Sequence, residues 1–291
     1  MRAGRREVPL THPDKVLFPD DGITKADLAA YYRDVGSTML AHVRDRPVSM
    51  QRYNAGIGRD GFFQKDIGRG APDWVRTIEV PKRGGTVRHP LANDVATLVW
   101  LANQNCITPH VWTARADRLD RPDRIIWDLD PSGDDDFPLV RRTAVELGDV
   151  LRDAGVEPFA MVTGSRGVHV VVPVHRRQGY EQARDAALAV AEELAARHPD
   201  ELTTAFRKAK RGERLFLDVN RNGYAATAVP AYAVRPRPGA PVATPVHWEE
   251  LADGALVPDG FTFRDVLGRL EGDGDPWAGM SLAARGLPRL G

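Results

Sequence analysis

Hydrophobic and polar positions along the chain predict a mixture of helices and strands. Apolar residues recur near helical spacing in residues 28–43, 137–155 and 180–199, and the run 93–105 is typical of a buried helix. Thr24 and Asp27 fit a capping box that begins the first helix, and Gly155 fits the end of the second. Shorter apolar runs predict strands over residues 47–53, 76–91 (a hairpin around Gly84-Gly85), 124–130, 159–162, 168–174 and 214–220.

These elements predict one compact α+β domain over residues 1–271. An N-terminal subdomain of about residues 1–120 precedes a more regular core of about residues 121–271, which includes extended, proline-punctuated chain. The last segment, residues 272–291, is rich in glycine and has little periodicity. We therefore expect a loosely attached tail there.

Composition narrows the class of protein only modestly. The 291 residues are 42% hydrophobic, enough for a substantial core, and 40 basic residues balance 40 acidic ones. Net charge therefore predicts neither a nucleic-acid binder nor a membrane protein. No apolar run reaches the roughly 18 residues of a membrane span, and no apolar signal region follows the N-terminus, so we expect a cytoplasmic protein. Cys106 is the single cysteine, which excludes an internal disulfide and a cysteine-rich zinc module.

The run IIWDLDPSGDDDF, residues 125–137, leads a hydrophobic strand into carboxylates. Residues i and i+2 of a strand share a face, so Asp128 and Asp130 point the same way while Leu129 points into the core. Two ionised carboxylates repel each other, and such oxygen ligands suit Mg²⁺ or Mn²⁺ bound together with substrate phosphates. The alternative is a pair of solvated carboxylates at a strand end. The three aspartates at 134–136 precede a predicted helix, so we expect them to cap its N-terminus.

The run MVTGSRGVHVVVP, residues 161–173, places a glycine-bounded turn between two predicted strands. Its glycines permit a tight turn whose backbone N–H groups face a phosphate, and its side chains add hydroxyls, a positive charge and a histidine ring. These polar residues are Thr163, Gly164, Ser165, Arg166, Gly167 and His169. Such a turn is what a nucleotide polymerase needs beside its metal ions. The alternative is a plain hairpin with a polar residue at its mouth.

The run LFLDVNRN, residues 215–222, again leads apolar residues into a carboxylate, Asp218. A third carboxylate on a neighbouring strand completes a two-metal site, with one ion for each reacting oxygen. Alone, Asp218 is most simply a strand-end carboxylate. Three hydrophobic strands that deliver an aspartate pair, a glycine-rich histidine hairpin and a further aspartate are harder to explain as chance.

In this combination the chain resembles the polymerase domain of bacterial ligase D, a primase–polymerase of the archaeo-eukaryotic primase superfamily that acts in non-homologous end joining. The resemblance covers about residues 11–264 and implies an α+β primase–polymerase fold, with mixed β-sheets around a catalytic cleft and flanking helices. The runs that carry it are DKVLFPDDGITKADLAAYY, FFQKD, LVWLANQNCITPHVW, WDLDP, TGSRGVHVVVP and LDVNRNGYAATAVPAYAVRPRPGAPVATP.

The resemblance implies the residues of an active site. It implies that Asp128, Asp130 and Asp218 are the catalytic, metal-binding triad. The residues implied for the incoming nucleotide are Thr163, Gly164, Ser165, Arg166, Gly167, His169, Arg221 and Arg235. Family members commonly carry serine at the position of Thr163, which keeps the hydroxyl and adds a methyl group; the change bears on nucleotide affinity and not on the chemistry.

The resemblance also implies contacts to DNA. Lys15 and Lys25 match lysines that bind the 5′-phosphate of the downstream strand at a gap, and Lys25 begins a predicted helix, whose N-terminus already favours phosphate. Phe62 and Phe63 match aromatic residues that pack on bases near the templating position. The alternatives are core positions for the two phenylalanines and a solvated surface charge for Lys15.

The implied reaction is template-directed nucleotidyl transfer at DNA gaps and ends, with two Mn²⁺ or Mg²⁺ ions and a preference for ribonucleotides over deoxyribonucleotides. The implied partners are DNA with a gap, an overhang or a 5′-phosphate, NTPs or dNTPs, the Ku end-binding protein and a separate ATP-dependent DNA ligase, in a nucleoid-associated cytoplasmic setting. The sequence has no K-x-D-G adenylation motif, so we expect a free-standing polymerase module. The lone cysteine excludes the zinc element of some replicative primases.

Other functions stay open at this point. A primase that starts chains without a primer shares every residue named above. A non-catalytic module that bridges DNA ends needs the two lysines and not Asp218. A metal-dependent phosphatase or nuclease needs the carboxylates and not the phenylalanines or the glycine turn. Haloacid-dehalogenase-type phosphatases and glycosyltransferases also use D-x-D pairs, but the position and surroundings of the motif fit both poorly.

Overall fold

The computed structural model describes residues 1–133 and 136–290, which form two compact units. The first unit comprises Met1–Asp117, Thr227–Ala243 and Phe261–Gly272, and the second comprises Arg118–Ala226, Thr244–Gly260 and the chain from Asp273 onward. The chain first passes between the units after Asp117, near the division expected at about residue 120, and it returns to the first unit twice. The sequence pattern gives no sign of these returns.

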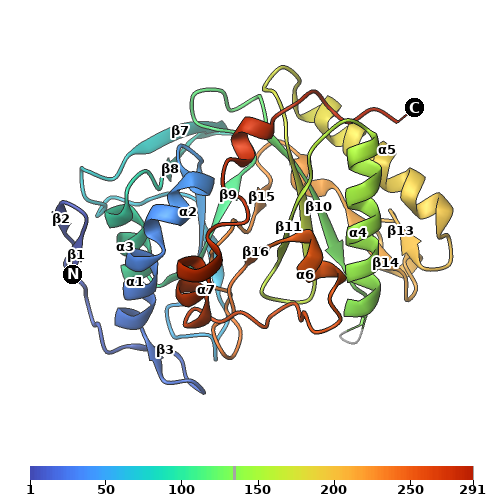
Figure 1. The fold of residues 1–291 in the computed structure, drawn as a ribbon. Helices are drawn as coiled ribbons and strands as arrows, with labels where there is room; N and C mark the ends of the chain where they lie inside the picture. The colour runs from blue at the N-terminus through green and yellow to red at the C-terminus, as the bar shows by residue number, and fades with distance from the viewer. Residues whose placement is uncertain (134–135, 291) are drawn as a thin grey trace. The chain divides into compact units, whose positions relative to one another are not determined.

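The second unit is built on a six-stranded sheet in the order β13-β14-β10-β12-β11-β16 (Figure 1). Its strands are β10 (Arg124–Asp130), β11 (Phe159–Val162), β12 (Val168–Pro173), β13 (Leu202–Thr203), β14 (Leu215–Asp218) and β16 (Thr244–Val246). β13 and β14 run parallel, and the other neighbours run antiparallel. The prediction of a mixed sheet is confirmed, and β10, β11, β12 and β14 coincide with predicted strands.

Helices α4 (Phe137–Asp153) and α5 (Tyr180–Arg197) pack on this sheet (Figure 1). Trp127 of β10 is fully buried, and its indole N–H donates to the carbonyl oxygen of Ala187 in α5 at 2.9 Å. Because side chains alternate along a strand, Asp128 and Asp130 project from the opposite face. A short helix, α6 (Trp248–Ala252), packs on α4.

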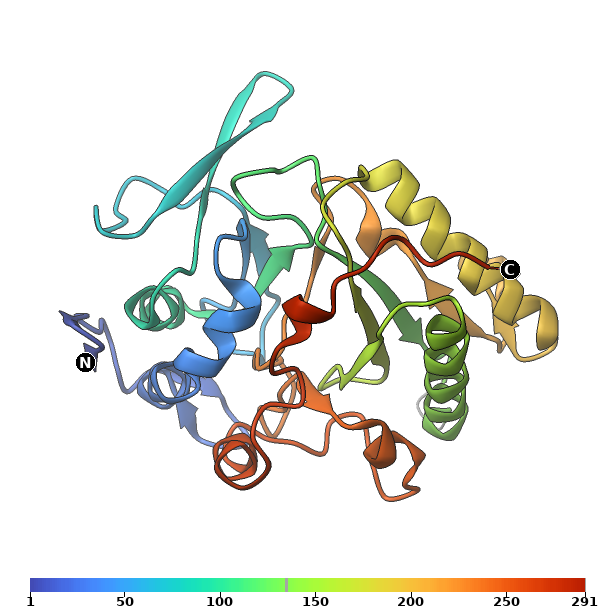
Figure 2. The ribbon, with the colours of Figure 1, turned by 45° about the horizontal axis from the view of Figure 1, so that its top comes forward.

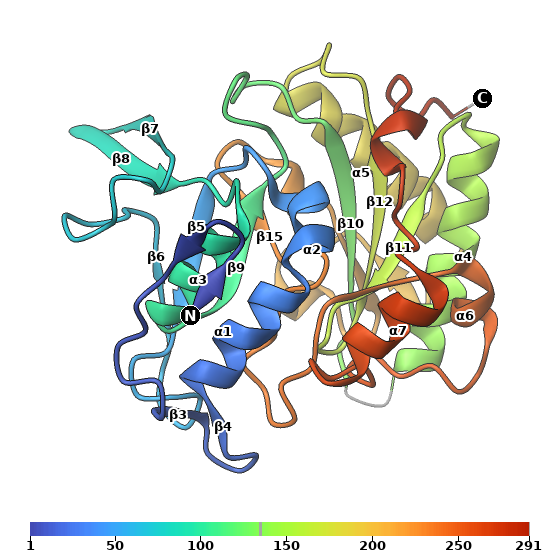
Figure 3. The same ribbon diagram turned by 60° about the vertical axis from the view of Figure 1, so that its left-hand side comes forward.

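The first unit contains a four-stranded antiparallel sheet in the order β15-β9-β5-β6, with helices packed beside it (Figure 3). The strands are β5 (Val48–Arg52), β6 (Phe62–Gln64), β9 (Cys106–Trp112) and β15 (Thr227–Ala228), and the helices are α1 (Lys25–Asp34), α2 (Gly36–Val43), α3 (Val95–Asn103) and α7 (Asp265–Asp273). Tyr31 and Tyr32 of α1 are buried, and their hydroxyls donate to the carbonyls of Tyr232 and Ile107. These bonds fix α1 against two distant segments of its unit.

Three two-stranded hairpins complete the first unit. They pair β1 (Arg2–Ala3) with β2 (Arg6–Glu7), β3 (Val16–Phe18) with β4 (Ile23–Thr24), and β7 (Thr77–Lys82) with β8 (Gly85–Pro90). The β7–β8 hairpin extends away from the other elements of its unit (Figure 2). It turns at Gly84 and Gly85, which both have positive φ, so the predicted hairpin is confirmed.

Single turns of 3₁₀ helix occur in the second unit, at η1 (Lys208–Lys210), η2 (Asn220–Asn222) and η3 (Met280–Ala283).

Predictions of local structure near helix ends are confirmed in part. The Thr24–Asp27 capping box is present, and Gly155 follows α4 with φ +78°. The single helix predicted over residues 28–43 is wrong, because the chain forms α1 and α2, which meet at Val35. Asp136 precedes α4, but its carboxylate accepts from the N–H of Gly133 and makes no capping bond. The capping role predicted for Asp134 and Asp135 falls outside the described residues.

The C-terminal segment is not the loose tail that its composition predicts. Trp277 is only 3% exposed, and its indole N–H donates to the carbonyl oxygen of Ala160 in β11 at 2.9 Å. Val174 forms a parallel bridge with Arg285. One buried aromatic side chain therefore attaches a segment that has no periodicity. Among the helices of residues 1–133 and 136–290, none is long and apolar enough to cross a membrane.

Candidate functional site

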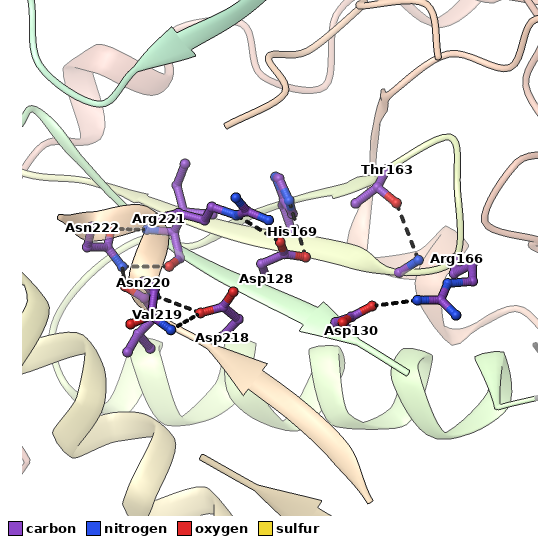
Figure 4. Close-up of polar contacts among 12 residues, drawn as sticks. Asp128, Asp130, Thr163, Arg166, His169, Asp218, Val219, Asn220, Arg221 and Asn222 are labelled. Atoms are coloured by element: carbon purple, nitrogen blue, oxygen red, sulfur yellow. Dashed lines mark hydrogen bonds and ion pairs between the residues drawn. The ribbon is translucent and has the colours of Figure 1, made fainter. Parts of the chain in front are cut away.

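The predicted carboxylates stand in neighbouring positions on one face of the six-stranded sheet (Figure 4). Asp128 of β10 lies directly opposite Asp218 of β14 on one side and directly opposite His169 of β12 on the other. Directly opposite residues of antiparallel strands share a face, with Cβ atoms about 4.5–5.5 Å apart. Asp130 lies two residues along β10 and shares the same face. The strand register thus brings together four side chains from three separate stretches of sequence.

Asp128 is more enclosed than Asp130, with a side chain that is 15% exposed against 40%. One of its oxygens lies 3.4 Å from Nε2 of His169, and the other accepts from Nε of Arg221 at 3.2 Å. Burial alone would raise the pKa of Asp128, but the neighbouring His169 and the Arg221 guanidinium outweigh burial and hold that pKa well below its ordinary value. Asp128 is therefore a permanent anion at neutral pH.

Asp130 has the opposite electrostatic character. Burial and the negative charge of Asp128 raise the pKa of Asp130, although Arg166 and Arg211 oppose the increase. Arg166 donates to one carboxylate oxygen at 3.1 Å, and Nη1 of Arg211 lies 3.7 Å from the other. The two aspartates of β10 therefore repel each other, and arginines offset the repulsion. The contact from Arg211 was not evident in the sequence, because nothing in its local pattern separates it from the other arginines nearby.

Asp218 is held by the turn that follows it. Its Oδ1 accepts from the backbone N–H of Asn220 at 2.8 Å and from the Asn220 side-chain amide at 2.6 Å. Asn222, two residues further along the same turn, is 1% exposed and pairs with the backbone of Ile126 in β10. The Ile126 N–H donates to Asn222 Oδ1 at 2.9 Å, and Asn222 Nδ2 donates to the Ile126 carbonyl at 2.7 Å. Asn222 therefore continues the pairing of β10 past the end of β14. This fixes the position of Arg221 beside Asp128.

The side chains as they lie do not form a closed metal cage. Within the part of the chain that the structure describes, no group of three or more His, Cys, Asp or Glu side chains is arranged to hold a metal ion. The reason is that the carboxylates turn toward arginines and an asparagine. The donor set nevertheless fits Mg²⁺ or Mn²⁺, because the register gives three carboxylates on one face and the raised pKa of Asp130 reports a repulsion that a cation relieves.

The glycine turn between β11 and β12 lies against the end of β10. The N–H of Thr163 donates to the carbonyl of Gly167 at 3.0 Å, and the N–H of Gly167 donates to the Thr163 hydroxyl at 3.3 Å, so the turn closes on itself. Gly164 has φ +62°, a left-handed conformation that favours glycine. A Cβ at Gly167 would lie only 2.1 Å from the carbonyl oxygen of Leu129. The turn therefore approaches the β10 backbone between Asp128 and Asp130 too closely for any side chain at Gly167.

His169, two residues after the glycine turn, carries a buried ring nitrogen without a hydrogen-bond partner among the described residues. The side chain is 4% exposed, its Nε2 faces Asp128, and its Nδ1 is buried with no hydrogen-bond partner within residues 1–133 and 136–290. Buried polar atoms are nearly always paired, so an unpaired one indicates a group that binds there. Arg166 also extends from the turn and is about as exposed as Asp130, to which it donates. The turn thus combines a positive charge with a free ring nitrogen.

The predicted phosphate-binding lysines lie together in the first unit. Lys25 is 3% exposed and its ammonium donates to the carbonyl of Thr11 at 2.7 Å, while its backbone N–H donates to the carbonyl of Lys15. The Lys15 ammonium donates to the carbonyl of Asn54. Burial, followed by the charges of Lys15 and Arg52, lowers the pKa of Lys25. A surface pocket of about 410 Å³ is lined by residues that include Lys15 and His12. Like charges that lie this close together, one of them buried, are stabilised by an anion.

The predicted stacking residues lie at the surface of the same unit. Phe62 is 43% exposed and Phe63 is 55% exposed, so the alternative that they are core residues is wrong. Arg52, directly opposite Phe62 in the β5–β6 pairing, places its guanidinium 5.6 Å from the Phe62 ring centroid. Phe63 makes an edge-to-face contact with His110 at 5.1 Å. Arg52 and His110 were not predicted as site residues. His110 lies in a run that carries the family resemblance, and Arg52 lies in the strand predicted over residues 47–53.

Arg235, predicted for the nucleotide site, also lies in the first unit. Its backbone N–H donates to the carbonyl of Pro241 at 2.7 Å. Burial raises the pKa of Tyr53, and the Arg235 charge opposes that increase, so the two side chains are close. The predicted site residues therefore divide into a carboxylate, glycine-turn and arginine group in the second unit and a lysine, phenylalanine and Arg235 group in the first.

Comparison with known proteins matches this arrangement to one family. The family model of the LigD primase-polymerase domain matches residues 24–277. The multifunctional non-homologous end joining protein LigD of Mycolicibacterium smegmatis is 33% identical over 270 residues, which are 92% of this chain and 35% of that protein. The corresponding protein of Pseudomonas aeruginosa is 33% identical over 282 residues, 95% of this chain and 33% of that protein. The chain thus spans about a third of the length of these relatives.

A solved structure supports the same assignment. The polymerase domain of Mycobacterium tuberculosis ligase D, in complex with DNA, superimposes with a TM-score of 0.89 and 30% sequence identity, and the match covers 96% of this chain and 99% of that one. The similarity to this domain therefore extends from the sequence to the fold. The chain belongs to the LigD primase–polymerase domain family.

Proposed function

We propose that the protein is a template-directed nucleotidyltransferase that adds NTPs or dNTPs at gaps and ends in DNA repair by non-homologous end joining. The observation that carries this proposal is the register that places Asp128 between Asp218 and His169, with the glycine turn pressed onto β10 beside them. Family membership supports the same reaction. A phosphatase or nuclease needs the carboxylates alone, and it leaves the unpaired His169 ring nitrogen and the closed turn without a role.

Asp128, Asp130 and Asp218 would hold two divalent ions, Mn²⁺ or Mg²⁺. When bound, these ions supply charge neutralisation at the attacking and leaving oxygens of the phosphoryl group. Asp128, whose pKa is held low, provides a permanent anion for them. Asp130 is the more exposed carboxylate of β10, at 40%, so it faces the substrate side of the pair.

The glycine turn and His169 bind the incoming nucleotide in this proposal. The glycine turn, with Gly164 in the left-handed conformation, and the Arg166 guanidinium are proposed as the binding site of a triphosphate. Nε2 of His169 lies against Asp128, and its buried Nδ1, which has no partner among the described residues, is proposed to hydrogen-bond to a phosphate oxygen. Arg221 and Arg235 are proposed as further contacts to the same nucleotide.

The first unit binds DNA in this proposal. Lys15 and Lys25 hold the 5′-phosphate of the downstream strand, which offsets the burial and the like-charge repulsion that lower the pKa of Lys25. Phe62 and Phe63 present exposed rings that stack on bases near the templating position. The finer biology is also part of the proposal: a preference for ribonucleotides, co-operation with Ku and a separate ATP-dependent ligase, and association with the nucleoid.

The experiment that tests the proposal is extension of a primer across a short DNA gap whose downstream strand carries a 5′-phosphate, with Mn²⁺ and either rNTPs or dNTPs. We expect templated addition by the wild type. Asp128→Asn should lower the rate by about 10²–10³-fold, since it removes a permanent anion from the metal site. Asp120→Asn is the matched control in the same unit, because Asp120 is 70% exposed.

Other outcomes identify the alternatives. Addition on an unprimed template would indicate a primase, and tight binding to gapped DNA without addition under either nucleotide set would indicate an end-bridging module. Release of inorganic phosphate or cleavage of the strand, lost in Asp128→Asn, would indicate a phosphatase or nuclease and would contradict the proposal.

A further inference from the structure

The β1–β2 hairpin concentrates positive charge at one place on the first unit. Residues 1–7, MRAGRRE, contain three arginines and one glutamate, in a chain whose charges balance overall. The segment is called here the arginine hairpin, and Arg2, Arg5 and Arg6 are all exposed. Arginines gathered on one exposed element create a local positive potential, which favours a polyanionic partner.

The inner face of the arginine hairpin is fixed to its unit. Ala3 and Arg6 lie directly opposite each other and therefore share a face, and Ala3 is only 2% exposed. The Arg6 guanidinium lies 5.1 Å from the ring centroid of Trp74. Its Nε also lies 3.7 Å from a carboxylate oxygen of Asp94, the N-cap residue of α3. Arg6 is therefore an anchor that holds the hairpin against the beginning of α3.

Arg2 and Arg5 are the outward groups of the hairpin. Arg2 lies opposite Glu7 on the other face, and Arg5 lies in the turn between β1 and β2. Neither guanidinium takes part in an ion pair or a side-chain hydrogen bond among residues 1–133 and 136–290. A guanidinium presents a planar set of N–H donors that matches the oxygens of a phosphate. The outward face is thus suited to a phosphate backbone.

Helix α3 connects the arginine hairpin to the proposed 5′-phosphate site. At the C-terminal end of α3, Oδ1 of Asn103 accepts from the N–H of Thr11 at 2.9 Å, and the carbonyl of Thr11 accepts from the Lys25 ammonium at 2.7 Å. At the N-terminal end, Asp94 meets Arg6. Because α3 has 9 residues and a helix rises about 1.5 Å per residue, the two places are about 14 Å apart along it. The chain between them runs from β2 to β3 (Figure 3).

The stacking residue Phe62 belongs to the same end of α3 as the phosphate site. Arg52 donates from Nε to the carbonyl of Gln104, which directly follows α3, at 2.7 Å, and the Arg52 guanidinium lies 5.6 Å from the Phe62 ring centroid. In the proposed function the unpaired template base meets Phe62, and the downstream strand begins at Lys25. The paired DNA beyond that point leads away from Phe62, and the arginine hairpin lies at the opposite end of α3.

We infer that the arginine hairpin binds the phosphate backbone of the downstream duplex, through Arg2 and Arg5. B-DNA advances about 3.4 Å per base pair, so about 14 Å places this contact about four base pairs beyond the 5′-phosphate. Contacts to phosphates position a protein on DNA and carry no base information, so the contact applies to any sequence. The inference rests on the proposed function and extends it to paired DNA, which the predicted lysine and phenylalanine contacts do not cover.

The test measures equilibrium binding, without nucleotide, to a gapped DNA whose downstream duplex begins with a 5′-phosphate and spans more than one helical turn. In one substrate, uncharged methylphosphonate linkages replace the third to sixth phosphates of the downstream duplex. In a control substrate, the same number of linkages is replaced at the far end of that duplex. For the wild type we expect only the first replacement to weaken binding beyond the control, with the slope of log Kd against log salt lower by about 1.8, or about 0.9 for each lost contact.

The variant Arg2→Gln/Arg5→Gln should show the same decrease in slope, about 1.8, on unmodified DNA. It should then be insensitive to the near methylphosphonates, because the two changes remove the same contacts. Arg2→Lys/Arg5→Lys keeps both charges and should retain the wild-type slope. Arg33→Gln/Arg264→Gln is the matched control, since it removes the same charge from exposed positions elsewhere in the first unit, and it should also retain the wild-type slope.

A wild-type slope in Arg2→Gln/Arg5→Gln would overturn the inference, and so would an equal decrease in Arg33→Gln/Arg264→Gln. If Arg2→Gln/Arg5→Gln binds weakly but still loses affinity with the near methylphosphonates, the arginines contact another part of the DNA and the inference is wrong. Failure of the proposed function appears separately, as a wild type that extends no primer, while the salt dependence of binding to gapped DNA is still measurable.

Discussion

Gly167→Ala tests the close approach between the glycine turn and the aspartate strand. Gly167 has ordinary φ, so alanine introduces no backbone strain of its own. The added Cβ, however, would lie 2.1 Å from the carbonyl oxygen of Leu129 and 3.6 Å from Pro131. Non-bonded C···O contacts in proteins lie near 3.3–3.6 Å, so the turn and β10 must separate by about 1.2–1.5 Å. The carbonyl that moves lies between Asp128 and Asp130.

The expected cost follows from that displacement. Overpacking of a well-packed site costs about 1–3 kcal/mol of stability. A misplacement of about 1 Å at a catalytic site lowers the rate by about 10²-fold, whereas a loss of 1–3 kcal/mol leaves a protein of ordinary stability, about 5–15 kcal/mol, folded. Gly167→Ala should therefore remain folded at 25 °C and extend primers about 10²-fold more slowly than the wild type. Because the turn is also part of the proposed nucleotide site, the KM for nucleotide should rise as well.

Thermal unfolding and single-nucleotide extension measure the two effects. Gly155→Ala is the control for a left-handed glycine without a clash, since Gly155 has φ +78° and no atom within 4 Å of an added Cβ. Gly70→Ala is the neutral control, because its Cβ would also meet open space and its φ is not positive. Gly155→Ala should lose about 1 kcal/mol of stability and keep wild-type activity. Wild-type activity in Gly167→Ala would show that the turn does not determine the position of the carboxylates.

Three further outcomes are expected. Burial lowers the pKa of Lys25 below 10.5, so the preference for gaps with a 5′-phosphate over gaps with a 5′-hydroxyl should be full below that lowered pKa and lost as the pH rises through it. The ratio of the two Kd values, measured from pH 7 to 10, tests this. Lys25→Arg should keep the preference over the whole range. Asn222→Ala leaves the N–H and carbonyl of Ile126 without their partner and should cost about 3 kcal/mol of unfolding free energy in urea. Trp127→Phe removes a buried indole N–H bond and should cost about 1–3 kcal/mol in the same assay, whereas a change below 0.5 kcal/mol would contradict the assigned contact.

The helices and central strands could be predicted from the sequence because their signals are local. β10, β11, β12 and β14 are continuous apolar runs between turn residues, and α4 and α5 bury residues that recur three or four positions apart. β9 was not predicted, although Cys106–Trp112 is largely buried, since Pro109 and the polar residues interrupt its apolar run. The attachment of the C-terminal segment was also missed, because it depends on Trp277 meeting a carbonyl of β11, a contact between residues far apart in sequence.

The candidate site also has features that local sequence predicts and features that depend on contacts between distant residues. The shared face of Asp128 and Asp130 follows from strand geometry alone, and their exposure relative to Leu129 agrees with it. The pairing of Asp128 with Asp218 is a register between strands 90 positions apart, which no local pattern specifies. Arg211, Arg52 and His110 were missed for a related reason. Each is one of many polar residues in the sequence, and only its spatial neighbours distinguish it.

The arginine contacts explain why the carboxylates diverge although the backbone brings them together. Several carboxylates in a partly buried site repel one another, so each side chain turns to the nearest positive charge or amide donor. Arg221 takes that role for Asp128 and Arg166 for Asp130, at 3.2 and 3.1 Å. A divalent ion offers the same compensation through direct oxygen ligation at about 2.0–2.1 Å for Mg²⁺. Rotation about side-chain bonds exchanges one partner for the other, whereas the Cβ positions are fixed by the β10–β14 register. The register, and not the present ion pairs, is therefore the property of the sheet that brings the proposed metal-binding carboxylates together.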